Sequence, residues 1–216
     1  MFTDLLPIVT LSLYVSTLAL LIAVVIGLPL GACLALFSIP GKRLWELIIY
    51  TGMGFPTVVV GLLVYLLLSR SGPLGGLGWL FTPRAIIVAQ TIIALPMVAG
   101  LVQSTFEALD PNLRYLLRSL SASPWQEIWA LLGEARSGML VAVIAAFGRI
   151  FSEVGAVMLV GGNIEGQTRV LTTSIVLQTR QGQFDSALVL GALLVTISLL
   201  INALVLRIGR RRDLRF

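Results

Sequence analysis

The chain has 216 residues, of which 57% are hydrophobic and 12% are charged, and its mean hydropathy is +1.00. Soluble domains carry about 25% charged residues, so this composition excludes a water-soluble protein and indicates one that lies in a lipid bilayer. The net charge of +5 does not indicate a nucleic-acid partner. Five of the fifteen basic residues fall in the last ten positions, beside an apolar segment, which is a membrane topology signal.

The chain has no histidine and one cysteine, Cys33, so neither a disulfide framework nor a Cys/His metal site can be assembled. We expect Cys33 to be a small packing residue. The first apolar run is preceded by Asp4 but by no basic stretch, and no small-residue cleavage pattern follows it. This pattern predicts an uncleaved N-terminal anchor.

Five segments are apolar and long enough to cross a bilayer core, which takes about 20 helical residues. The first holds Gly27, Pro29 and Gly31, which bend a helix or permit close contact between helices. The fourth contains Arg149 and Glu153, four residues apart on one helical face, where they partly neutralise one another. We therefore expect a single all-α, polytopic membrane domain over residues 1–216, with spans at about 5–37, 47–69, 85–106, 137–160 and 186–206.

Five spans place the two chain ends on opposite sides of the membrane, and loop charges select the orientation. With the N-terminus outside and the C-terminus cytoplasmic, ten basic residues lie inside and four outside, which agrees with the positive-inside tendency. We therefore expect a multi-pass protein of the cell (inner or plasma) membrane. The inner set is Lys42, Arg43, Arg114, Arg118, Arg136, Arg207, Arg210, Arg211, Arg212 and Arg215, and the outer set is Arg70, Arg84, Arg169 and Arg180. In the outer segment after the fourth span, TTSIVLQT is typical of a short helix near the membrane surface.

The cytoplasmic loop, residues 109–136, carries two helix starts. Asp110 and Pro111 begin an amphipathic helix, and the run from Ser123 to Gln126 supplies a serine cap, a proline in the first turn and a glutamine three residues on. Two short helices are therefore expected to meet at a capped corner. An ordinary linker resting on the membrane surface is the alternative. About 25 residues with two starts exceed what a connection requires, which favours an element that another protein moves.

The loop resembles the "EAA" loop of ABC importer permeases. The pattern has Glu-Ala-Ala where this chain has Tyr115 to Leu117, Gly where it has Ser121, and Ile-x-Leu-Pro where it has Leu131 to Glu134. The glutamate, glycine and proline of the pattern are therefore absent. GRIFSEVGAVMLVGGNIEGQTRVLTTSI from Gly148 and TGMGFPTVVVGLLVYLLLSRSGPLG from Thr51 look like the permease subunit of tungstate importers, a branch near the molybdate and sulfate permeases. The GEAR segment in place of Leu-Pro is itself a feature of the tungstate branch.

This resemblance implies a MetI-like ABC importer permease fold of about five transmembrane helices. It implies a homodimer with two copies of a separate ATPase and an extracytoplasmic substrate-binding protein, and uptake of a tetrahedral oxyanion by alternating access. Tungstate is the expected substrate, with molybdate or sulfate as alternatives. The chain has no phosphate loop, its only lysine lying in PGKR, so we expect no cofactor here and ATP bound by the partner.

The resemblance further implies that the corner of the loop is the coupling element that sits on the ATPase. Four residues near the corner are expected to make polar contacts with the ATPase, and four others are expected to pack against the partner or the bilayer (the seating set). The polar set is Arg114, Arg118, Gln126 and Glu127, the seating set is Leu116, Leu117, Leu120 and Trp125, and the corner is Ser121, Ala122, Ser123 and Pro124.

The substrate pathway is expected at the ionisable residues inside the membrane. One face of the fourth span carries Arg149, Ser152 and Glu153. Arg149 would attract an anion, and Glu153 would keep Arg149 from binding that anion too tightly. A purely structural ion pair is the alternative. A second candidate region is a constriction formed by Pro56, Thr57 and Val58, for which plain packing is the alternative, and a third is Gly161, Gly162 and Asn163, a docking turn for the binding protein or a simple helix stop.

A membrane-embedded enzyme is the alternative from another class, with Glu153 as acid or base and Arg149 as its partner. It lacks support, because the chain has no histidine, thiol pair, two-carboxylate arrangement or metal motif. A small channel or a membrane scaffold would not need the capped corner.

Overall fold

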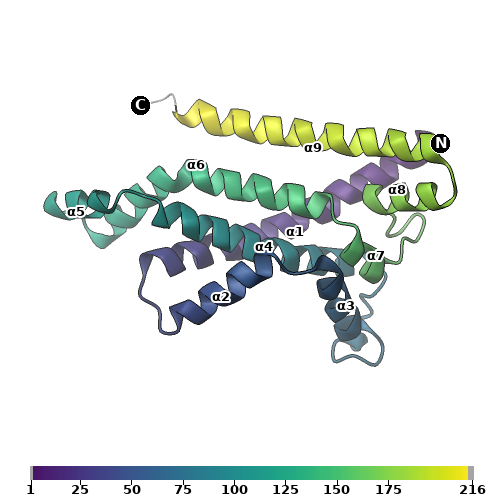
Figure 1. Ribbon diagram of the computed structural model, residues 1–216, viewed down its shortest axis with the longest axis horizontal. Helices are drawn as coiled ribbons and strands as arrows, with labels where there is room; N and C mark the ends of the chain where they lie inside the picture. Colours follow the sequence, from purple (N-terminus) through teal and green to yellow (C-terminus); the bar gives the residue numbers. More distant parts are fainter. Residues whose placement is uncertain (1, 214–216) are drawn as a thin grey trace.

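The computed structural model describes residues 2–213, and within this range it consists of helices and connecting turns without a strand. The helices form an elongated bundle in which α1 begins at one end and α9 ends at the other (Figure 1). In chain order the elements are α1 (Phe2–Leu36), α2 (Lys42–Met53), α3 (Thr57–Leu68), the 3-10 turn η1 (Gly75–Leu77), α4 (Pro83–Glu107), α5 (Pro111–Ser119), α6 (Pro124–Phe151), α7 (Gly155–Gly161), α8 (Leu171–Arg180) and α9 (Phe184–Asp213).

Four helices of the described chain, namely α1, α4, α6 and α9, are long and apolar enough to cross a membrane. A fifth crossing exists if α2 and α3 are counted together. The predicted spans 5–37, 85–106 and 186–206 correspond to α1, α4 and α9. The expected all-α bundle of about five membrane helices is therefore confirmed.

Small residues let the backbones of α1 and α4 approach closely. A Cβ atom on Gly27 would lie 3.0 Å from the Cβ of Val98, and one on Gly31 would overlap the carbonyl oxygen of Ala99. The close helix contact predicted at these two glycines is therefore present. Cys33 of the same helix is exposed, so the expectation that it is a packing residue is wrong.

The second predicted span, 47–69, is not one helix. The chain leaves α2 at Gly54 and enters α3 after Pro56, and the two helices are bent by 103°. Pro56 has no N–H group to continue a helix, and its ring disfavours the helical conformation at Phe55. α2 then packs along α4, while α3 packs against α7. The expectation of one continuous span is wrong because the proline redirects the chain.

The fourth predicted span, 137–160, is wrong at both ends. α6 is continuous from Pro124 to Phe151, so it includes the second helix of the predicted loop. No proline follows Pro124 within α6 and its charged residues are good helix formers, so nothing ends the helix at the predicted membrane boundary. The chain turns at residues 152–154 before the short helix α7.

The helix predicted around TTSIVLQT is present as α8. Its first turn is buried, and the N–H of Leu171 donates to the Oγ of Ser12 in α1 at 2.8 Å. α8 lies beside the first half of α9, at the end of the bundle where α1 begins (Figure 1). Tertiary packing therefore draws this segment into the bundle. Its buried residues are Leu171, Thr172, Thr173 and Ser174.

Candidate functional site

Two helix breaks lie against one another. A Cβ atom on Gly155, after the break between α6 and α7, would be 2.7 Å from the Cγ2 of Val58, after the break between α2 and α3. One turn further on, a Cβ on Gly61 would be 2.6 Å from the Cα of Ala156. A Cβ on Gly155 would also be 3.6 Å from the Oε1 of Glu153, and Arg149 and Phe55 line one cavity, so the two candidate pathway regions, 56–58 and 149–153, lie near one another although they are far apart in sequence.

Polar groups from α4, from α8 and from the break itself hold the break between α6 and α7. Glu153 is buried, and its Oε1 accepts a hydrogen bond from the N–H of Ala156 at 3.0 Å. Thr172 donates to the carbonyl oxygen of Glu153 at 2.9 Å, and Gln90 donates to that of Ile150 at 3.0 Å. Backbone groups freed at a break inside a membrane need such partners. Glu153 therefore caps the start of α7.

The expected ion pair between Arg149 and Glu153 is not formed. α6 ends at Phe151, so the two residues are not on one helical face, and Glu153 points at the next helix. Among the described residues no carboxylate forms an ion pair with Arg149, which is exposed. Ser152 is also exposed, and its hydroxyl donates to the carbonyl oxygen of Gly148 at 2.8 Å. Arg149 is thus a cation without a carboxylate partner in the part of the chain that the structure describes.

Arg149 lines a cavity of about 250 Å³ between α2, α3 and α4. The other lining residues are glycine, proline or apolar, and none is acidic. The cavity lies next to the break, where Phe55 contributes to its wall and α3 starts without a side-chain cap. The first turn of a helix carries partial positive charge from its free N–H groups. An apolar cavity with a guanidinium and a nearby helix N-terminus favours an anion.

The three candidate constriction residues lie at the start of α3. Pro56 occupies the cap position, Thr57 is half-buried in the first turn, and Val58 is exposed beside Gly155. These residues adjoin the cavity and are not among those that line it.

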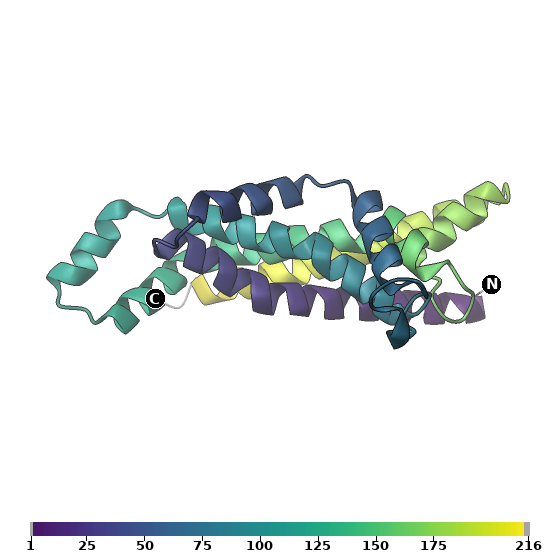
Figure 2. The same ribbon diagram turned by 90° about the horizontal axis from the view of Figure 1, so that it is seen from below.

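The capped corner of the loop is present as the sequence predicted. The N–H of Gln126 donates to the Oγ of Ser123, and the Gln126 side chain accepts from the N–H of Ser123 at 2.8 Å. Asp110 accepts from the N–H of Asn112 at 2.8 Å and so begins α5. Ser121 turns the chain with a positive φ of 60°. α5 and the start of α6 project as a hairpin beyond the ends of α1 and α4 (Figure 2).

Charged residues of the loop bind one another. Glu127 is buried, and its carboxylate forms ion pairs with Arg114 and Arg118, each at 3.1 Å. Arg114 also donates to the carbonyl oxygen of Leu36 at the end of α1, at 3.2 Å. The hydrogen bond and charge of Glu127 raise the pKa of Arg118 above its usual value. Three of the four predicted polar contact residues therefore stiffen the hairpin and tie it to α1.

The outer surface of the hairpin is apolar and aromatic. Leu116, Leu120 and Trp125 are exposed, whereas Leu117 and Ala122 are half-buried. Trp129, which the sequence analysis missed, lies edge-on against Trp125 at 5.7 Å between ring centroids and is also exposed. The four-residue spacing of the two tryptophans was the available signal.

A second polar network, also missed, joins α2 to α4 close to the hairpin. Gln103 is fully buried, and its Nε2 donates to carboxylate oxygens of Glu46 and Glu107, both at 2.9 Å. The Nζ of Lys42 lies 3.6 Å from Glu46 and 3.7 Å from Glu107. A glutamine inside an apolar run, four residues before a glutamate, was the sequence signal. The network links α2 to the C-terminal end of α4.

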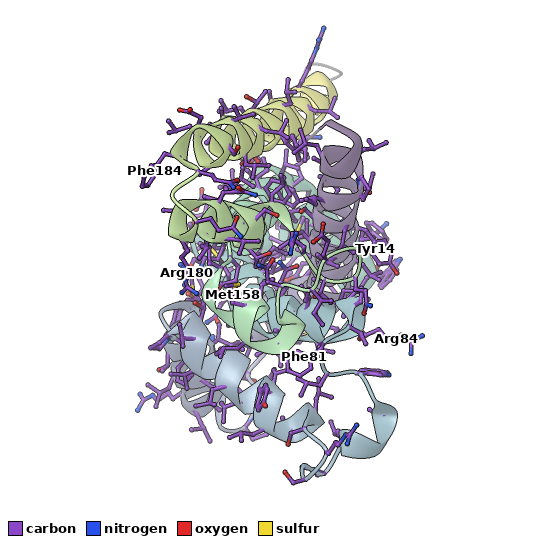
Figure 3. The ribbon with its side chains drawn as sticks, turned by 90° about the vertical axis from the view of Figure 1, so that its right-hand side faces the viewer. Tyr14, Phe81, Arg84, Met158, Arg180 and Phe184 are labelled. Atoms are coloured by element: carbon purple, nitrogen blue, oxygen red, sulfur yellow. The ribbon has the colours of Figure 1, made fainter. Side chains whose placement is uncertain are left out.

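The third candidate region ends α7. Gly162 and Asn163 have positive φ values of 70° and 52°, and Gly161 is buried. The carbonyl oxygen of Gly161 accepts from Thr168, and Gly162 lies against Phe81. Figure 3 looks onto this end of the bundle, where Phe81 and Met158 lie near the middle. This geometry supports the helix-stop alternative.

Comparison with known proteins supplies relatives along nearly the whole chain. Residues 23–214 match the family described as binding-protein-dependent transport system inner membrane component. A probable anion ABC transporter permease protein of Haloferax volcanii is 42% identical over 214 residues, 97% of this chain and 92% of that protein. A tungstate uptake system permease protein of Peptoclostridium acidaminophilum is 39% identical over 198 residues, 92% and 87% respectively. A molybdenum transport system permease protein of Escherichia coli (strain K12) is 30% identical over 216 residues, 94% of each.

A solved structure shares the fold. The methionine ABC transporter MetNI in an inward-facing conformation matches with a TM-score of 0.80 over 98% of this chain and 97% of that one, at 22% identity. The expected MetI-like arrangement of helices is therefore confirmed.

Proposed function

The chain belongs to the family of binding-protein-dependent transport system inner membrane components, and we propose that it carries a tetrahedral oxyanion, tungstate in the first place, into the cytoplasm. The chain is a transport subunit and not an enzyme, since its relatives are permease subunits. Tungstate is favoured because the tungstate permease is 39% identical and the molybdenum permease 30%. A molybdate or sulfate permease is the second candidate.

The observation that carries the proposal is the position of Arg149. A guanidinium without a counterion costs several kcal/mol in hydrocarbon, so its place on a membrane helix requires water or an anion beside it. The cavity that it lines is apolar and contains no carboxylate. One cation and the dipole of α3 attract a dianion, yet leave it free to depart, which is what a conduit needs. In a homodimer, two copies of Arg149 would match the two charges of the substrate.

Switching of the pathway is assigned to the hairpin of α5 and α6. Two ATPase subunits would hold its exposed face of Trp125 and Leu120, and an extracytoplasmic binding protein would deliver the anion at the opposite end. The ion pairs of Glu127 make the hairpin stiff enough to transmit force. Force then reaches α1 through Arg114 and α2 through the Gln103 network, and so reaches the cavity. This is alternating access driven by ATP.

Uptake by proteoliposomes tests the pathway. The permease, its ATPase and its binding protein are reconstituted together, and entry of tungstate is measured for Arg149→Gln and Arg149→Lys. We expect Gln to abolish most uptake and Lys, which keeps the charge, to retain a substantial part. ATP hydrolysis in the absence of substrate should continue in both. Full uptake by Arg149→Gln would remove this residue from the pathway.

Two further measurements test substrate and orientation. Calorimetry of the cognate binding protein with tungstate, molybdate and sulfate should give the tightest binding for tungstate, and tightest binding of sulfate would overturn the assignment. A Ser123→Cys variant in a Cys33→Ser background should be labelled by an impermeant maleimide only from the cytoplasmic side. Labelling from outside would refute the proposed topology, with N-terminus outside and C-terminus cytoplasmic.

A further inference from the structure

A second cavity lies at the end of the bundle where α1 begins. It measures about 340 Å³, and its wall is formed by Tyr14 of α1, by Trp79 and Thr82 of the loop before α4, and by Arg84 in the first turn of α4. Figure 3 shows Tyr14 and Arg84 on the same side of this end of the molecule. The cavity is separate from the one lined by Arg149.

The polar groups of this cavity favour an anion. The guanidinium carbon of Arg84 lies 5.9 Å from the centroid of the Trp79 ring, which holds the cation in place. Thr82 donates to the carbonyl oxygen of Trp79 at 2.6 Å and fixes the loop. None of the lining residues is acidic, and none of the described carboxylates pairs with Arg84. Stacking on a ring leaves the edge of the guanidinium free to donate hydrogen bonds.

The depth of the cavity places it where lipid headgroups lie. Arg84 is the second residue of the span that begins at Pro83, so it marks the boundary of the hydrocarbon core. Tryptophan and tyrosine are the residues that gather at this boundary. Two of the elements that supply the wall, α1 and the loop before α4, also carry exposed apolar side chains. They include Leu21, Ile22 and Val25 of α1, and Leu74 and Leu77 of the loop.

We propose that this cavity binds the phosphodiester group of an anionic glycerophospholipid, whose acyl chains lie along the exposed face of α1. A free inorganic anion would contact only one exposed guanidinium, whereas a lipid adds contacts with the apolar side chains. A zwitterionic headgroup is disfavoured because its ammonium finds no carboxylate, and the ring of Trp79 is already covered by Arg84.

Native mass spectrometry of the purified full chain tests this site. The protein is exchanged into mixed micelles with equal amounts of phosphatidylglycerol and phosphatidylcholine, and the lipids retained after detergent removal are counted. We expect preferential retention of phosphatidylglycerol. Arg84→Gln should lower this retention about fivefold, the factor that one interfacial arginine contributes. Arg84→Lys should restore part of it.

Arg70→Gln is the matched control, because Arg70 is an exposed arginine of the same loop outside the cavity. It should retain phosphatidylglycerol like the unaltered chain, and thermal unfolding in lipid-free detergent should be the same for both variants. Unchanged retention by Arg84→Gln, or an equal loss with Arg70→Gln, would overturn the proposal. Displacement of the lipid by millimolar inorganic phosphate or tungstate would overturn it too, since the site would then take free anions.

Discussion

The network around Gln103 gives a sharp stability prediction. Replacing Gln103 with leucine keeps the buried volume nearly constant and removes both hydrogen bonds to Glu46 and Glu107. A hydrogen bond to a charged group is worth about 1.5–3 kcal/mol when it is buried. The two carboxylate side chains are 26% and 43% exposed, so water replaces much of this. We expect Gln103→Leu to lower the free energy of unfolding by about 1–2 kcal/mol.

Gln103→Glu is the decisive comparison, because it is isosteric and exchanges a donor for a third carboxylate. Two like charges about 4 Å apart repel by roughly 4 kcal/mol at an effective dielectric constant near 20. Lys42 offsets only part of this, since it already bridges Glu46 and Glu107. Thermal unfolding in detergent micelles should therefore give the order unaltered chain, Gln103→Leu, Gln103→Glu, from most to least stable. A Gln103→Glu protein as stable as the unaltered chain would refute the network.

Three further predictions test the hairpin and the breaks. Trp125→Ala should lower tungstate uptake relative to ATP hydrolysis while membrane insertion stays normal, and normal uptake would exclude the hairpin from coupling. Gly61→Ala should lower the free energy of unfolding by about 1–3 kcal/mol, because its Cβ would lie 2.6 Å from the Cα of Ala156. The control Gly191→Ala, whose Cβ would have open space around it, should leave that free energy unchanged or raise it. The Glu153→Gln protein keeps an acceptor for the N–H of Ala156 and should take up tungstate normally, whereas the Glu153→Leu protein should not. Loss of uptake in both variants would assign a direct role to the negative charge of Glu153.

The two wrong span boundaries have different physical causes. In the second span, Pro56 breaks the helix, but the angle between the two halves depends on where each half finds a packing partner. α2 packs on α4 and α3 packs mainly on α7, and the two helices are bent by 103°. In the fourth span, hydropathy placed the start of the helix at the membrane boundary. The helix itself starts at the Ser123 cap, because helix formation obeys local hydrogen bonding and not the bilayer edge.

Some candidate residues were visible in the sequence, whereas others depend on neighbours that only the fold supplies. Arg149 was found because a charge inside an apolar run is visible in any sequence. Its expected partner was wrong, because Ser152 to Val154 break the helix on which the pairing depended. Trp129 and Gln103 were missed since each is ordinary by itself and acquires a role only from its neighbours in space.

The sequence by itself determined that this chain lies in a bilayer, how many segments are apolar enough to cross it, and where α5 and α6 begin. These features depend on composition and on contacts within a few residues, such as Ser123 with Gln126. Only the tertiary structure decided that Val58 meets Gly155, that Glu153 caps α7, and that Gln103 joins Glu46 across the bundle. Such contacts depend on how helices distant in sequence pack side by side, and no local pattern of residues specifies that arrangement.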